Sequence, residues 1–252
     1  MLKINISSII AIGMIASLSA CTKKGDTGAT GPAGAAGPSY TGAISGHVSL
    51  YDQYGSKVLT GLESAQISLN GSTAINANTS GYYIFGGTMT GSYTLTASAN
   101  GYGATRVSNF QYLSDTLNRD IKMSAIPNFS PATFNVYPTA AGTGDSVVMT
   151  FTTDPRVRSC TIFLNNNSTC NNLPANYLLT YTRSIGANVP RAVIIIPTQD
   201  LIDAGFTSGS TVYFSAYGSA VNDVSAYEDY STGKAVYNAV SASPLTTTAI
   251  VP

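Results

Sequence analysis

Apolar and polar residues alternate in several short stretches between residues 43 and 125. Residues 44–50 and 65–69 both show this period of two, and Asn70-Gly71 directly after the second stretch is a strong hairpin signal. Successive side chains of a strand point to opposite faces of a sheet, so the alternation predicts half-buried strands. Further strands are expected at 81–85, 91–97 and 116–123.

The second half of the chain, residues 126–252, repeats this pattern after Pro127 and Pro131 interrupt it. The run Val193-Ile-Ile-Ile is strongly apolar and predicts a buried strand, while 198–204 followed by Gly205 predicts one turn of helix. The other expected strands are 133–137, 146–151, 157–164, 177–183, 211–217 and 234–240.

A series of short motifs in residues 43–125 resembles the carboxypeptidase regulatory-like domain, a transthyretin-like (prealbumin-like) β-sandwich. The motifs are Gly46-His-Val48, Ala65-x-Ile67-x-Leu69, Thr79-Ser-Gly81-Tyr-Tyr83-x-Phe85, Gly91-x-Tyr93-x-Leu95 and Gly101-Tyr102. The resemblance implies a sandwich without catalytic residues of its own. Two features depart from the family pattern: the connection 51–61 is longer than usual, and 86–89 replaces a Leu-centred turn.

The order and spacing of strands in 126–252 are similar to those of an immunoglobulin or fibronectin type III sandwich.

Composition supports the same fold class. Charged residues make up 10% of the chain, against about a quarter in average domains, and Lys and Glu, which favour helices, are scarce. We therefore predict an all-β protein with two tandem β-sandwich domains, 43–125 and 126–252. The formal net charge is zero and no basic run occurs, which argues against nucleic acid as a partner.

The N-terminus has the layout of an export signal. Lys3 precedes an uncharged run, 4–17, which is shorter than the roughly 20 apolar residues of a membrane-spanning helix. Leu18-Ser-Ala-Cys21 resembles the lipobox of bacterial lipoproteins. The resemblance implies that 1–20 is a signal peptide and that Cys21 carries the lipid that attaches the protein to a membrane. An ordinary secretory signal or an uncleaved membrane helix is the alternative.

Residues 21–42 form the expected tether. Glycine occurs at every third position, at Gly25, Gly28, Gly31, Gly34 and Gly37, which resembles the collagen repeat. Five triplets are few, so an extended spacer of up to about 65 Å is favoured over a collagen-like trimer. Similar tracts after the lipidated Cys are familiar in surface lipoproteins of the Bacteroidetes, which by resemblance suggests the outer membrane.

The two other cysteines, Cys160 and Cys170, predict a disulfide, because an even pair in an exported chain is typical of one. A zinc or redox role is disfavoured, since no third Cys accompanies them, the chain's single His is His47, and the spacing is not C-x-x-C.

No catalytic group, metal site or cofactor site is predicted. His47 lies on the polar side of its strand with no activated Ser or Cys nearby in sequence. Asp223, Glu228 and Asp229 could supply oxygens to Ca²⁺, but a solvated loop is the favoured interpretation. Nine tyrosines are candidates for a sugar-stacking platform: Tyr82, Tyr83, Tyr93, Tyr102, Tyr112, Tyr213, Tyr217, Tyr227 and Tyr230.

The sequence thus predicts a non-enzymatic surface lipoprotein of the cell envelope, lipid-anchored at Cys21 to the outer membrane. Its role would be structural or adhesive, or that of an accessory subunit with a protein partner in an envelope complex. The alternative is a glycan-binding lipoprotein that supports polysaccharide capture and uptake.

Overall fold

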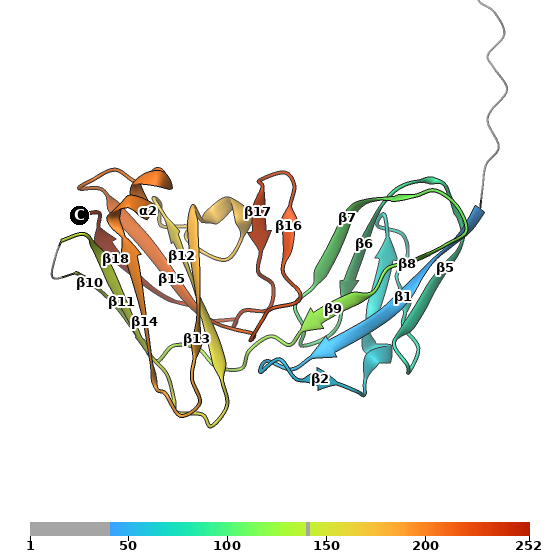
Figure 1. Cartoon of the computed structure of the whole chain (residues 1–252), viewed down its shortest axis with the longest axis horizontal. Helices are drawn as coiled ribbons and strands as arrows, with labels where there is room; N and C mark the ends of the chain where they lie inside the picture. The colour runs from blue at the N-terminus through green and yellow to red at the C-terminus, as the bar shows by residue number, and fades with distance from the viewer. Residues whose placement is uncertain (1–40, 140–141) are drawn as a thin grey trace, which may run out of the picture. The chain divides into compact units, whose positions relative to one another are not determined.

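The computed structural model describes residues 41–139 and 142–252 (Figure 1). The predicted signal peptide, the lipid site at Cys21 and the glycine triplets lie outside the described residues. The described chain is built of strands with one short α-helix and two 3₁₀ turns, which confirms the all-β sandwich fold class. Within it, no helix is both long and apolar enough to span a bilayer.

Two sheets enclose the first hydrophobic core. One has β1 (Thr41–Tyr51) at its centre, flanked by β2 (Lys57–Val58) and β5 (Tyr82–Met89) in antiparallel pairing and by β8 (Thr116–Asn118) and β9 (Ile121–Ser124) in parallel pairing. The other has the order β4-β3-β6-β7, formed by β4 (Ile75–Asn76), β3 (Gln66–Leu69), β6 (Gly91–Ser98) and β7 (Thr105–Tyr112). Inward-facing residues of both sheets, such as Ile44, Ile67 and Leu95, form one buried cluster.

Local sequence explains two features of this first part. Asn70 and Gly71 have φ values of 49° and 71°, and the Ser72 N–H donates to the Leu69 carbonyl, so the predicted tight turn is present. A Cβ at position 46 would lie 2.1 Å from the Arg119 carbonyl oxygen, so only glycine fits there without a shift of the backbone. The absence of a side chain lets the chain around Arg119 pass close to β1, where the Arg119 N–H donates to the Ser45 carbonyl at 2.7 Å.

Two further sheets enclose the second core. Their orders are β10-β11-β14 and β13-β12-β15-β18, drawn as two layers in Figure 1. The strands are β10 (Thr133–Pro138), β11 (Gly144–Thr150), β12 (Arg158–Asn165), β13 (Leu179–Ile185), β14 (Arg191–Pro197), β15 (Thr211–Ser219) and β18 (Leu245–Ile250). A separate hairpin, β16 (Tyr227–Asp229) with β17 (Lys234–Val236), lies in the connection from β15 to β18. Side chains from both sheets, including Ile162, Ile194 and Phe214, form the buried cluster.

The helical segments are short. The predicted helical turn is α2 (Thr198–Asp203), which begins after Pro197 and is followed by Gly205 at φ 92°. The two 3₁₀ turns are η1 (Leu62–Ser64) and η2 (Pro174–Asn176).

The predicted disulfide is not formed in the structure, where Cys160 and Cys170 are both free and buried. Cys160 belongs to the second core, whereas Cys170 packs against Phe163 in a separate aromatic cluster. Cys160 and Phe163 are an odd number of positions apart on β12, so their side chains point to opposite faces of the sheet. The two thiols are therefore on different sides of β12.

Candidate binding groove

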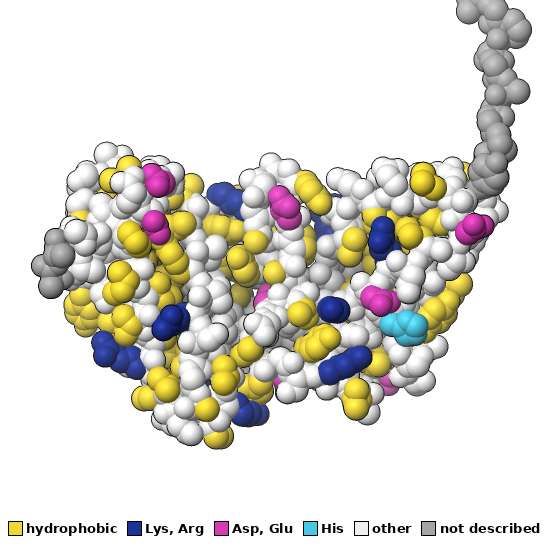
Figure 2. Space-filling model, viewed as in Figure 1, with side chains coloured by type: hydrophobic (Ala, Val, Ile, Leu, Met, Phe, Trp, Pro, Cys, Tyr) yellow, Lys and Arg dark blue, Asp and Glu magenta, His cyan; other side chains and the backbone are white. Residues whose placement is uncertain are grey.

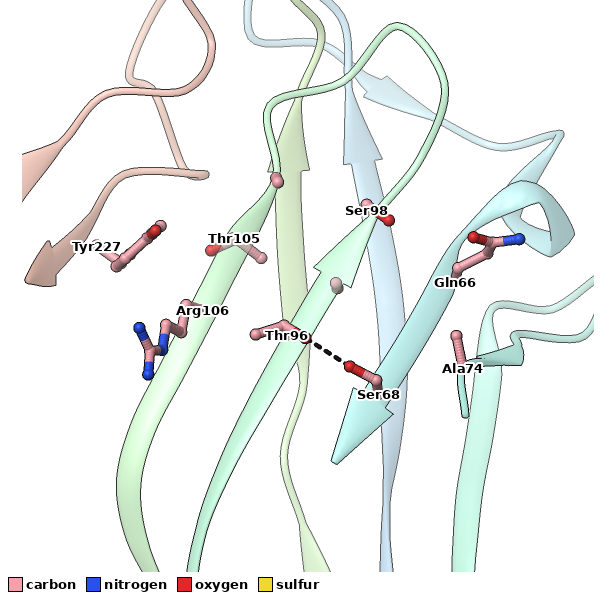
Figure 3. A pocket seen from close by; sticks show the side chains of 10 residues that line it. Gln66, Ser68, Ala74, Thr96, Ser98, Thr105, Arg106 and Tyr227 are labelled. Atoms are coloured by element: carbon pink, nitrogen blue, oxygen red, sulfur yellow. Dashed lines mark hydrogen bonds between the residues drawn. The ribbon is translucent and has the colours of Figure 1, made fainter. Parts of the chain in front are cut away.

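The outer face of the β4-β3-β6-β7 sheet is polar. Inward positions of β3 and β6 are apolar, and the outward positions carry Gln66, Ser68, Thr96 and Ser98. Ser68 pairs with Thr96 across the strands, and Thr96 pairs with Arg106 on β7. The Ser68 and Thr96 hydroxyl oxygens are 2.6 Å apart (Figure 3). This regular register places hydroxyl, amide and guanidinium groups side by side on one exposed surface.

A cavity of about 280 Å³ lies on this surface. Tyr227 of β16 contributes to its lining, and Figure 3 shows this side chain next to the β7 side chains Thr105 and Arg106. The cavity is thus bounded by an aromatic side chain on one side and by polar strand residues on the other.

A second cavity of about 230 Å³ adjoins the first at Arg106, which lines both. Its other lining residues are Ser108, Asn109, Glu228, Asp229, Tyr230 and Ser231. We call the two cavities together the Arg106 groove.

The residues that line the Arg106 groove include one cation, Arg106, and two acids, Glu228 and Asp229. The Asp229 carboxylate accepts hydrogen bonds from the Ser231 N–H at 3.0 Å and from its hydroxyl at 2.8 Å. These bonds, with a smaller contribution from the charge of Arg106, lower the pKa of Asp229. Arg106 itself makes no ion pair with any described residue, so its guanidinium N–H groups remain available to a ligand.

The groove offers donors and acceptors but no facing pair of acids. Glu228 and Asp229 come from one strand, and the opposite wall of their cavity carries Arg106, Ser108 and Asn109. Glycoside cleavage by the common mechanism needs two carboxyl groups that flank the scissile bond. The residues that line the groove do not include such a facing pair.

Other residues considered in the sequence lie elsewhere. His47 is exposed on β1, where its backbone N–H donates to the Asp120 carboxylate at 2.9 Å. Asp223 lines a different cavity from Glu228 and Asp229, so the three acids do not converge on one calcium loop. Across residues 41–139 and 142–252, no group of three or more His, Cys, Asp or Glu residues could hold a metal ion.

The nine candidate tyrosines do not form one platform. Tyr83, Tyr112 and Tyr217 are buried, and the hydroxyls of the first two donate to the carbonyls of Arg119 and Asp115. Only Tyr227 and Tyr230 line the Arg106 groove.

Arg106 was not singled out from the sequence. The available signal was a lone cation in an otherwise uncharged stretch, 105–112, which becomes meaningful only when the sheet register is known.

No protein-family model and no curated protein matches the chain. A "putative carbohydrate binding protein" from Bacteroides uniformis ATCC 8492 is 14% identical, with 82% of this chain and 99% of that chain covered and a TM-score of 0.32. A DUF3823 family protein from Parabacteroides merdae ATCC 43184 is also 14% identical, with 82% and 98% covered and a TM-score of 0.27. A DUF3823 family protein from Bacteroides uniformis ATCC 8492 is 12% identical, with 84% and 100% covered and a TM-score of 0.29. At such identities and TM-scores, none of these similarities supports an argument about function.

Proposed function

We propose that this protein is a non-catalytic, lipid-anchored protein of the cell envelope that binds a glycan in the Arg106 groove. The observation that carries the proposal is the groove itself, which combines the unpaired guanidinium of Arg106, strand hydroxyls and the Tyr227 side chain. The structural or adhesive role expected from the sequence is then the second candidate.

The chemistry of the groove matches that of a sugar. A sugar ring presents hydroxyls that both donate and accept hydrogen bonds, and the side chains of Ser68, Thr96 and Gln66 do the same. Its apolar C–H face can pack against an aromatic side chain such as Tyr227, whose hydroxyl can also form a hydrogen bond. Arg106 can add charge-assisted bonds, which are stronger than neutral ones.

The envelope location rests on the sequence. Acylation of Cys21 would hold the protein on a bilayer, since each buried CH₂ contributes about 0.8 kcal/mol and two chains anchor stably. The tether would then hold the groove away from the membrane surface.

The test is glycan-array screening of the full-length lipoprotein in detergent, followed by calorimetric titration of the best glycan. Arg106→Ala should weaken binding by about tenfold or more, since a hydrogen bond to a charged group is worth about 1.5–3 kcal/mol. Tyr227→Ala should weaken it as well. Arg191→Ala and Tyr137→Ala are matched controls on exposed positions of β14 and β10 and should bind like the wild type. Absence of any glycan ligand, or unchanged binding by Arg106→Ala, would overturn the proposal.

The second candidate, a structural subunit with a protein partner, has one observation in its favour. β5 pairs only with β1 among the described strands, and its Ile84 and Met89 side chains are 48% and 57% exposed. An open strand edge can accept a strand from another protein. Cross-linking that traps a protein partner through β5, together with a silent glycan array, would favour this candidate.

A further inference from the structure

A cavity outside the Arg106 groove lies on the outer face of the β13-β12-β15 sheet. Its volume is about 150 Å³. Three serines from neighbouring strands meet there in one row, because Ser159 pairs with Ser184 on one side and with Ser219 on the other. Thr161 and Thr182 form the next row, with their hydroxyl oxygens 3.0 Å apart. The floor of the cavity is therefore a set of hydroxyl groups fixed by the sheet.

Two residues that line this cavity each carry a buried side-chain oxygen without a hydrogen-bond partner. Ser219 is 3% exposed and its Oγ is unpaired. Asp223, in the segment after β15, accepts a bond from the Ser225 N–H through Oδ1 at 2.9 Å, while its shielded Oδ2 is unpaired. Buried polar atoms without partners are rare in folded proteins and costly, so two in one cavity point to a missing ligand.

The charge of Asp223 is also unbalanced. Neither Lys nor Arg lines the cavity, and neither ion pair in the described part of the chain includes Asp223. A cation in the cavity would supply the missing positive charge.

We propose that the Asp223 cavity binds a small hard cation, with Ca²⁺ as the best fit, through Asp223 Oδ2, Ser219 Oγ and neighbouring hydroxyl oxygens. All polar side chains lining the cavity offer oxygen atoms, the ligand type that hard cations prefer. Ca²⁺ accepts irregular sets of six to eight oxygens, including water, whereas Mg²⁺ demands near-ideal octahedral geometry. With a single carboxylate the site should be weak, with Kd on the order of 10⁻⁴–10⁻³ M, as in extracellular calcium modules.

This site differs from the calcium loop considered in the sequence. That interpretation grouped Asp223 with Glu228 and Asp229, which line the Arg106 groove instead. The cation site uses sheet hydroxyls in place of those two acids, and it does not depend on glycan binding.

The test measures apparent Tm and Tb³⁺ luminescence of the full-length protein in detergent after removal of divalent ions. Adding CaCl₂ to about 5 mM, above the expected Kd, should raise the apparent Tm of the wild type in a concentration-dependent manner. Mg²⁺, and Na⁺ or K⁺ at equal ionic strength, should have a smaller effect. Tb³⁺ bound in the cavity should be sensitised by Tyr237, which lines it.

Two variants and a matched control locate the site. Asp223→Asn keeps an oxygen for the Ser225 N–H but removes the charge, so Ca²⁺ affinity should fall by at least tenfold. Ser219→Ala should lower the affinity by several-fold, while Asp229→Asn should respond to Ca²⁺ like the wild type. In metal-free buffer Asp223→Asn should be at least as stable as the wild type, which separates a lost ligand from a misfolded variant.

The proposal is overturned if Ca²⁺ leaves the wild-type Tm unchanged, or if Asp223→Asn responds as the wild type does. It is also overturned if a neutral sugar raises the apparent Tm of the wild type but not of Asp223→Asn, while no cation raises it. Failure of glycan binding at Arg106 would leave all these results unaffected.

Discussion

The guanidinium of Arg156 stacks on the ring of Tyr54, with 3.6 Å between Arg156 Cζ and the ring centroid. The Asp154 carboxylate accepts bonds from both side chains, at 3.1 Å from the Arg156 Nε and 3.2 Å from the Tyr54 hydroxyl. Tyr54 belongs to the connection 51–61, which is longer than the corresponding connection of the carboxypeptidase regulatory-like domain that residues 43–125 resemble. Its Tyr54 side chain lies against the segment that leads into β12.

The Tyr54–Asp154–Arg156 network predicts a pH dependence. Hydrogen bonds from Arg156 lower the pKa of Asp154 to about 2, below its ordinary value. The charged form is therefore favoured by folding, so its contribution is present above the unfolded-state pKa and is lost as pH falls towards about 2. Asp154→Asn should reduce thermal stability at pH 7, and the difference from the wild type should shrink between about pH 4 and pH 2.

Thermal unfolding followed by circular dichroism across this pH range checks the prediction. Asp203→Asn, an exposed acid in α2, serves as the control, with no comparable loss at pH 7. A pH-independent difference between Asp154→Asn and the wild type would show that the carboxylate charge contributes nothing.

Gly46 provides a test of the β1 packing. A methyl group at this position would collide with the Arg119 carbonyl oxygen, at 2.1 Å from the added Cβ. Gly46→Ala should therefore lower the free energy of unfolding by about 1–3 kcal/mol, the usual cost of overpacking, when measured by denaturant titration. Gly86→Ala on β5 is the matched control, because a Cβ there meets no atom within 4 Å. Equal effects of the two substitutions would contradict the proposed close approach.

The two thiols should be inert in the folded protein. Burial raises the pKa of Cys160 to about 12 and that of Cys170 to about 11, so little reactive thiolate is present at pH 8. A thiol reagent should label neither residue in the native state and both after unfolding without reductant. Cys170→Ala should then show one residue labelled instead of two.

The same measurement decides the disulfide predicted from the sequence. Absence of labelling after unfolding without reductant, with both residues labelled once a reductant is added, would show that the pair is oxidised and that the strand arrangement around β12 differs from the one described.

Much of the fold could be predicted from local sequence, and the missed strands have a physical reason. In β7 the register shifts near Asn109, whose φ is 54°. Thr105 and Val107 face inward before the shift, and Phe110 and Tyr112 face inward after it, so no single period of two runs through the strand. In β18, Ile250 points to solvent and three consecutive threonines separate Leu245 from Ala249, so the apolar pattern is too weak to predict a strand.

The candidate sites were less accessible to sequence reasoning because they depend on long-range contacts. Arg106 and Tyr227 come together only through packing of β16 beside β7. The row of Ser184, Ser159 and Ser219 exists only once three strands are aligned in register. Single Ser and Arg residues in a Ser-rich chain carry no signal before those alignments are known.

Lipid attachment at Cys21 gives the last prediction. If the Leu18-Ser-Ala-Cys21 motif is processed as in bacterial lipoproteins, cells fed an alkyne-tagged fatty acid should label the wild-type protein, and mass spectrometry should find an acylated Cys21 at the mature N-terminus. Cys21→Ser should lose the label, because the thiol that would accept the lipid is absent. Cys170→Ala should keep the label, because the thiol of Cys170 is buried in the aromatic cluster and is not the expected site of acylation. An unmodified Cys21 in a chain that still begins with Met1 would remove the basis for an anchored protein.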